Sequence, residues 1–207
     1  MLRFNNTQKY ITLDFETEDL NLVKTKPFQV SWVVSTLKDG VISEKDYYLK
    51  WPDLNMSASA RAITHFDDAH YNKNAVDPKK VLDELDALMY DPSYIVVGQN
   101  ILGFDIYVHN VLRQLCGQPT DYSYIPRVID TKALSMAKNA SVAYNGDSRI
   151  LWQYRVMTIT KGKGKNSQLS LLKSLDIPFD ENKLHNSLYD VTMTFEIFKK
   201  LIWSIEI

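Results

Sequence analysis

The chain has 207 residues, of which 45% are hydrophobic and 24% are charged, and its net charge is −1. This length and composition predict one globular domain with a full core, and the near-neutral charge excludes a protein that coats nucleic acid through a broad basic surface. The single cysteine, Cys116, excludes an intramolecular disulfide and a multi-cysteine zinc site.

The sequence contains neither a recognisable secretion signal nor a membrane span. Its first six residues do not begin an apolar run, and no later run reaches the roughly 18 apolar residues that a spanning helix needs. We therefore expect a cytoplasmic protein without membrane contact, built as one domain over residues 1–207.

The first part of the chain predicts three strands joined by short turns. Residues 9–16 alternate and end on acidic residues, and residues 28–36 are β-branched and aromatic, so both predict strands. Asp39 and Gly40 form a hairpin-type turn, after which residues 41–51 supply a third strand. A polar stretch with helical spacing follows.

The rest of the chain predicts alternating helices and strands. We expect helices from Pro78, over 103–116, over 131–138 and from Asn186 or Ser187, with strands over 95–98 and 128–130. This order indicates an α/β fold with a mixed five-stranded sheet flanked by helices. Residues 150–160 are typical of a strand or hairpin and residues 161–167 of a basic loop, so we expect a hairpin or loop insertion around 140–168.

Four acidic residues and one histidine form a candidate catalytic set. Asp14 and Glu16 are two apart on a predicted strand and share a face, where burying two like charges is costly unless a cation compensates. Asp105 and Asp190 begin helices, and His185 precedes the last one. Taken singly, Asp14 and Glu16 are explained by exposure at a strand end, and Asp105 and Asp190 by favourable interaction with helix dipoles. His185 alone is explained as a solvated loop residue. Together they supply what two-metal phosphodiester hydrolysis needs: carboxylate ligands and a proton acceptor.

The joint pattern resembles the DEDDh branch of 3′–5′ exonucleases, which includes a bacterial polymerase proofreading subunit, RNase T and oligoribonuclease. The run 14–17 matches its Asp-x-Glu-Thr motif, the pair 104–105 its Phe-Asp motif, and the run 185–190 its third motif with the histidine spacing. Asp130-Thr131 resembles the pair that follows the second motif, and residues 170–177 resemble the short helix before the third.

The resemblance implies a ribonuclease H-like fold and a mechanism with two Mg²⁺ or Mn²⁺ ions, which oxygen-only ligands also favour. It implies that Asp14, Glu16 and Asp190 hold the ion that binds the attacking water. Asp14 and Asp105 would serve the second ion. His185 would deprotonate the water, so that nucleoside 5′-monophosphates leave from a 3′ end.

The same resemblance suggests which residues contact the substrate. Thr17 and His65 correspond to positions near the terminal nucleotide, and Lys161, Lys163 and Lys165 could grip phosphates, although a solvated glycine-rich turn explains these lysines equally well. Asn100 is a further candidate, but it lies five residues before Asp105 where many relatives have four. Glu18-Asp19 stands where many relatives have Thr-Gly, so contacts near the terminal nucleotide are expected to differ.

Several aromatic residues and histidines have ordinary explanations. Phe15 should point to the core, opposite the two acids. Trp152 and Tyr154 could stack bases, but alternating aromatics in a predicted strand more often pack in a core. His70 and His109 are expected at the surface.

We expect a nucleic-acid substrate, with DNA slightly favoured over RNA because no residue reads a 2′-hydroxyl unambiguously. An RNA-trimming exoribonuclease therefore stays an alternative. So does a non-catalytic nucleic-acid-binding or polymerase-associated module of the same fold, although the intact acidic set weighs against it. A polymerase or another replication or repair protein is left open as a partner.

Overall fold

The computed structural model describes residues 1–146, 148–160, 165–184 and 186–207. Three of the candidate site residues, Lys161, Lys163 and His185, lie outside these described residues. Within this part of the chain, none of the helices combines the length and apolar character that crossing a membrane requires.

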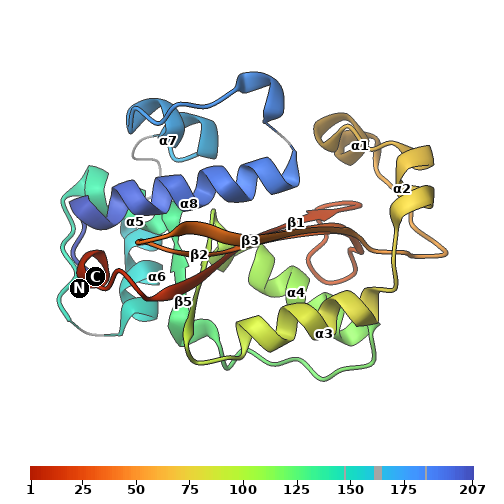
Figure 1. Cartoon of the computed structure of the whole chain (residues 1–207), viewed down its shortest axis with the longest axis horizontal. Helices are drawn as coiled ribbons and strands as arrows, with labels where there is room; N and C mark the ends of the chain where they lie inside the picture. Colours follow the sequence, from red (N-terminus) through yellow and green to blue (C-terminus); the bar gives the residue numbers. More distant parts are fainter. Residues whose placement is uncertain (147, 161–164, 185) are drawn as a thin grey trace.

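The centre of the protein is one mixed sheet of five strands in the order β3-β2-β1-β4-β5 (Figure 1). The antiparallel part contains β1 (Lys9–Thr17), β2 (Pro27–Thr36) and β3 (Gly40–Tyr48), and the strands parallel to β1 are β4 (Tyr94–Gly98) and β5 (Val128–Asp130). All five predicted strands are confirmed. The third is shorter than expected, since it ends at Tyr48 and the next residue forms only an isolated bridge with Val76.

Helices cover both faces of this sheet (Figure 1). They are α1 (Ala58–Thr64), α2 (Asp68–Asn74), α3 (Pro78–Met89), α4 (Asp105–Leu115), α5 (Thr131–Ala140), α6 (Arg149–Ile159), α7 (Gln168–Ser174) and α8 (Ser187–Ser204). The long helix α8 lies across one face together with α5 and α6, whereas α3 and α4 lie against the other. The predicted helices from Pro78, after residue 103, from Thr131 and near Asn186 are confirmed.

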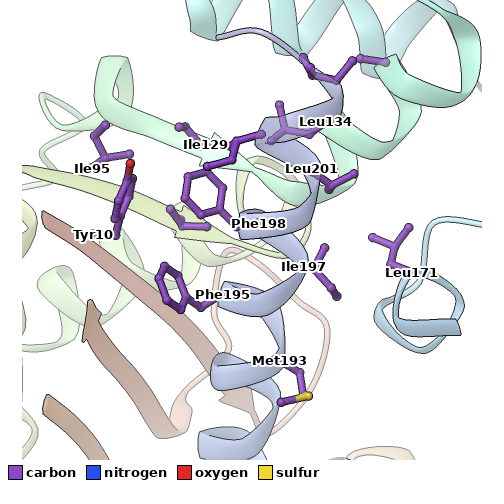
Figure 2. Close-up of a cluster of buried hydrophobic side chains, with 14 of the residues drawn as sticks. Tyr10, Ile95, Ile129, Leu134, Leu171, Met193, Phe195, Ile197, Phe198 and Leu201 are labelled. Carbon is purple, nitrogen blue, oxygen red and sulfur yellow. The ribbon is translucent and has the colours of Figure 1, made fainter. Parts of the chain in front are cut away.

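The alternation of side chains along β1 decides which face the candidate acids occupy. Tyr10 packs on the α8 face, where its ring centroid lies 4.9 Å from that of Phe198 (Figure 2). Phe15 is buried in the opposite core with α3 and α4, as predicted. Because side chains alternate along a strand, Asp14 and Glu16 project to the same face as Tyr10, toward α8.

The predicted strand or hairpin within 150–160 is wrong, because this segment forms helix α6. Ser148 caps the helix by accepting a hydrogen bond from the Leu151 amide. Trp152, Gln153 and Val156 are buried at the spacing of one helix face. Their β-branched and aromatic neighbours suggested a strand, but packing of that face overrides such propensities.

Helix α6 completes the edge of the sheet. The Gln153 side chain accepts a hydrogen bond from the Asp130 amide at 2.7 Å and donates one to the Val128 carbonyl at 3.0 Å. Both groups belong to β5, the strand at the end of the strand order. Gln153 therefore pairs backbone groups on an edge strand that would otherwise be buried without partners.

His109 was expected at the surface, and this prediction is wrong. Its ring is 1% exposed, with Nε2 at 2.7 Å from an Asp86 carboxylate oxygen and Nδ1 at 3.0 Å from the Tyr124 hydroxyl. Burial lowers the pKa of His109, although Asp86 opposes this effect. Arg113 pairs with the same carboxylate, so the network ties α3 to α4.

Candidate active site

The candidate site lies where β1 extends beyond its parallel neighbour. β4 pairs with β1 only up to Thr12, so Asp14 and Glu16 lie past the paired region, near the carboxyl end of β4. On the other side, β2 continues alongside and places Ser31 opposite Asp14 and Gln29 opposite Glu16. Ligand sites of open α/β sheets commonly lie at the carboxyl ends of parallel strands.

Beyond Thr12, where β4 no longer pairs with β1, the Asp105 side chain pairs with the backbone of β1 instead. Its side chain is 2% exposed, and one carboxylate oxygen accepts a hydrogen bond from the Phe15 amide at 3.0 Å. The first residue of α4 is thereby fixed to the segment between Asp14 and Glu16. A helix from one half of the chain thus brings its carboxylate to the strand segment that carries Asp14 and Glu16.

Asp190 completes the cluster from the opposite side. It lies in the first turn of α8, whose N-cap Asn186 accepts a hydrogen bond from the Tyr189 amide at 3.1 Å. The helix therefore begins where the sequence predicted, and its start is directed at the acid-bearing end of β1. His185 precedes this cap in sequence but lies outside the described residues.

Burial and the charges of neighbouring carboxylates raise the pKa values of Asp14, Glu16 and Asp105. Burial, followed by the charge of Asp190, raises the pKa of Asp14 to about 7. Burial, followed by the charges of Asp14 and Asp190, raises the pKa of Glu16 to about 9. Burial and the charge of Asp14 raise the pKa of Asp105 well above its usual range, although the Phe15 amide opposes this shift. Each of the four predicted acids is therefore linked to at least one other.

The donor chemistry of this cluster fits Mg²⁺ or Mn²⁺. All four side chains offer carboxylate oxygens, the ligands that these hard cations prefer. A cation would offset the neighbouring charges that, after burial, raise the pKa values of Asp14 and Glu16. Among the described residues, no three His, Cys, Asp or Glu side chains are already grouped closely enough to hold an ion. The fit therefore rests on donor chemistry and mutual charge effects, and it assigns no coordination geometry.

Asp130 organises the loop that leads to Asp105. This fully buried carboxylate accepts hydrogen bonds from the amides of Asn100 at 3.0 Å and Leu102 at 3.1 Å, and it caps α5 through the Lys132 amide. Burial raises the pKa of Asp130 to about 6, while these amides hold it down. This role of Asp130 was not predicted from the Asp-Thr pair, although an Asp at a strand end before a helix can signal it.

Asn100 has a positive φ of 62° and introduces the short 3₁₀ turn Ile101–Gly103 before α4. Its side-chain oxygen accepts a hydrogen bond from Lys132 Nζ at 2.9 Å. The longer spacing to Asp105 is thus accommodated by a left-handed residue and a tight turn, and the contact of Asn100 in this structure is with the protein itself.

A pocket of about 160 Å³ adjoins Glu16. Its lining includes the apolar side chains of Phe15, Leu20, Ile63 and Phe104. Thr17, a predicted substrate contact, also borders this pocket, while its hydroxyl donates to the Asp19 carbonyl at 2.5 Å. An apolar pocket next to a carboxylate cluster can receive the flat face of a nucleobase.

Glu18, which departs from the resembled pattern, supports this pocket. Its buried carboxylate accepts hydrogen bonds from the Lys26 amide at 3.2 Å and the Asn55 amide at 2.7 Å, and it forms an ion pair with Lys26 Nζ. Glu18 thereby ties the loop after β1 to the segment that precedes α1. It holds two neighbouring segments together, whatever the substrate.

The remaining predicted contacts differ in their exposure to solvent. His65 is exposed at the end of α1, with a φ of 52°, and it lines a groove of about 790 Å³ between α1, α2 and the residue Asn186 that caps α8. Lys165 is exposed. Trp152 is buried, so base stacking by this residue is ruled out, whereas Tyr154 is partly exposed.

No protein-family profile matches this sequence, and no curated protein resembles it significantly. Solved structures do share the fold. Escherichia coli exonuclease I in complex with a dA16 oligonucleotide matches with a TM-score of 0.73 at 16% identity, over 96% of this chain and 41% of that one. The zinc ion-bound form of the Escherichia coli exonuclease I–single-stranded DNA complex matches with 0.74 at 15% identity, over 95% and 41%.

A moderately thermophilic exonuclease I from Methylocaldum szegediense matches with a TM-score of 0.71 at 15% identity, over 94% of this chain and 40% of that one. This chain thus spans about two fifths of the length of these three proteins. At such identities the likeness establishes the fold, a mixed α/β sheet of the ribonuclease H-like type, as the sequence predicted.

Proposed function

We propose that this protein is a metal-dependent 3′–5′ exonuclease that acts on DNA and releases nucleoside 5′-monophosphates. One observation carries the proposal: Asp14, Glu16, Asp105 and Asp190 come from three distant segments that meet at one end of β1. The Asp105 carboxylate is bonded to the Phe15 amide, and the charge of Asp190 acts on both Asp14 and Glu16. The proposal is supported by the fold shared with exonuclease I, which was solved in complex with oligonucleotides.

The chain's own residues would share the work as follows. Asp14, Glu16 and Asp190 would hold one Mg²⁺ or Mn²⁺ ion, and Asp14 with Asp105 a second. When bound, the two ions would polarise the phosphodiester and stabilise charge on the attacking and leaving oxygens. His185 would remove a proton from the attacking water, since an ordinary histidine pKa near 6.5 suits a base at neutral pH.

Binding of the 3′ end would use the pocket beside Glu16. Its apolar lining can hold the terminal base, and Thr17 at its border can contact the sugar through backbone or hydroxyl. His65 would approach the terminal nucleotide, Asn100 would add a further contact, and the lysines at 161, 163 and 165 would grip phosphates. DNA is favoured by the DNA-bound neighbours. The partner class we propose is a polymerase or another replication or repair protein, supported by an ExoI/SSB-Ct complex among the structures that share the fold.

The test is cleavage of matched 5′-labelled single-stranded DNA, duplex DNA and RNA in Mg²⁺, Mn²⁺ or EDTA. We expect a metal-dependent ladder that shortens from the 3′ end. Asp14→Asn should reduce this activity to background because it removes a ligand shared by both ions. The matched control is Asp83→Asn, which changes an exposed acid on α3 paired with Lys79 and should cleave like the parent protein.

Full activity of Asp14→Asn would refute the metal assignment. Silence of the parent protein on every substrate, with DNA binding retained, would favour a non-catalytic nucleic-acid-binding module. Preferential shortening of RNA would favour the exoribonuclease alternative.

A further inference from the structure

Helix α7 is hydrogen-bonded to the backbone of Asp190. Gln168, the first residue of α7, donates one side-chain hydrogen bond to the Asp190 carbonyl at 2.7 Å and another to the Thr194 hydroxyl at 2.9 Å. The two acceptors lie one helical turn apart on α8. A single amide group thus fixes the first part of that helix against α7.

Two residues earlier, Asn166 is attached to the loop that leads to Asp105. Its carbonyl accepts a hydrogen bond from the Gln99 side chain at 2.7 Å, and its side-chain oxygen accepts one from the Ser135 hydroxyl at 2.9 Å. Gln99 also accepts a hydrogen bond from the Thr131 hydroxyl. Asn166 therefore joins the end of β4 to α5, immediately before the turn that positions Asp105.

Residues 166–168 thus form a strap that bridges two of the three segments bearing candidate ligands. Such a strap has a physical purpose here. The first turn of a helix has unpaired amides and opens readily, so the segment that carries Asp190 can move unless another element restrains it. Without a restraint, opening of this turn would move Asp190 away from the other carboxylates.

We propose that Gln168 is a positioning residue that holds the Asp190 carboxylate in register with Asp14 and Glu16, with Asn166 securing the same strap to the Asp105 loop. The proposal rests on the proposed metal-dependent function. Hydrogen-bonding partners behind metal ligands orient those ligands, and their loss commonly weakens metal binding about 10–100-fold. The donor group of Gln168, rather than its bulk, is the essential feature.

The test compares Gln168→Met with Gln114→Met in the full chain. Methionine keeps the length and apolar stem of glutamine but cannot donate a hydrogen bond. Gln114 is exposed near the end of α4, so its substitution is a matched control. Calorimetric titration with Mn²⁺ should show about 10–100-fold weaker binding for Gln168→Met alone. The Mn²⁺ concentration for half-maximal cleavage should rise equally, while KM for DNA stays unchanged.

Amide hydrogen exchange in metal-free protein separates this proposal from the proposed function. Faster exchange over 187–194 in Gln168→Met, but not in Gln114→Met, is the expected result and needs no catalysis. If exchange in this segment is unchanged, the strap is overturned, whatever the metal does. If the parent protein binds Mn²⁺, equal Mn²⁺ affinity of the two variants would also overturn it. If the parent protein binds no Mn²⁺ while Gln168→Met still exchanges faster, the proposed function fails but the restraint on Asp190 stands.

Discussion

At the scale of single residues, the same side chain serves different tasks according to its partners. Asp105 and Asp130 are both buried aspartates. Asp105 accepts a hydrogen bond from β1 while facing other carboxylates, whereas Asp130 is surrounded by four backbone amides and anchors a loop. A carboxylate with that many donors is satisfied within the protein. Asp105 has fewer donors and more like charge, which suits a metal ligand.

Candidate ligand residues such as Asp105 could be predicted from the sequence, whereas anchoring residues such as Asp130 could not. Asp14, Glu16, Asp105 and Asp190 belong to short motifs in a fixed order, so their types and spacings could be read directly. Asp130 and Gln168 act on backbone groups about 20–30 positions away. No local spacing encodes such a contact, because any backbone amide or carbonyl can be the partner.

His185→Ala tests the candidate base without removing a metal ligand. We expect the cleavage rate to fall about 10²–10⁴-fold, the usual contribution of a positioned general base. Mn²⁺ affinity, measured by calorimetry, should stay close to that of the parent protein, in contrast to Asp14→Asn. An exposed histidine changed in the same way, His70→Ala, is the control. A His185→Ala protein that cleaves at the parent rate would remove the histidine from the mechanism.

At the scale of elements, the spacing at which hydrophobic residues recur along the sequence predicted most of the fold. The strands and the helices α3, α4, α5 and α8 follow their predicted ranges closely. Helix α6 did not, because its apolar residues are also β-branched and aromatic and its buried face is narrow. What makes it a helix is its packing on β5 and the two hydrogen bonds of Gln153, which are tertiary contacts. Secondary-structure propensities judged from the sequence alone cannot include such tertiary contacts.

The buried network around His109 makes a prediction at this scale, because it ties α3 and α4 together. His109→Phe should lower the free energy of unfolding by about 2–4 kcal/mol. It leaves the Tyr124 hydroxyl and one Asp86 oxygen without the ring nitrogens that they now face, and unsatisfied buried polar groups cost about 1–3 kcal/mol each. Urea denaturation measures the change.

The control for this measurement is His70→Phe, which alters an exposed histidine and should change stability by less than about 0.5 kcal/mol. If His109→Phe proved as stable as the parent protein, the hydrogen bonds of the ring would contribute nothing to the pairing of α3 with α4.

At the scale of the whole molecule, the sheet topology explains why the site exists. Pairing of β4 with β1 stops at Thr12, and α4 then returns to β1 through Asp105. Helix α8 crosses the other face of the sheet from α4 (Figure 1), with Asp190 in its first turn. The fold thus concentrates negative charge at one point. That concentration lowers the stability of the metal-free protein, and a bound cation would recover it.

This loss of stability in the metal-free protein predicts how the free energy of unfolding depends on pH in EDTA. The folded-state pKa of Asp14 is about 7 against an ordinary value of 3.8, and that of Glu16 is about 9 against 4.5. Between these values the folded state binds more protons than the unfolded state, so stability falls as pH rises from about 4 toward 9. Asp14→Asn should flatten this fall, because it removes one titrating group and lowers the repulsion on Glu16.

Mn²⁺ should reverse the loss at the alkaline end, because it binds the ionised carboxylates of the folded chain. At 100 times its dissociation constant, the ion adds about 2.7 kcal/mol, which corresponds to roughly 5–10 °C in Tm for a chain of this size. Thermal melts at pH 5 and pH 8.5, in EDTA and in Mn²⁺, measure both effects. A parent protein whose Tm in EDTA is the same at both pH values, and which Mn²⁺ does not stabilise at pH 8.5, would show that these acids neither repel one another strongly nor share a cation.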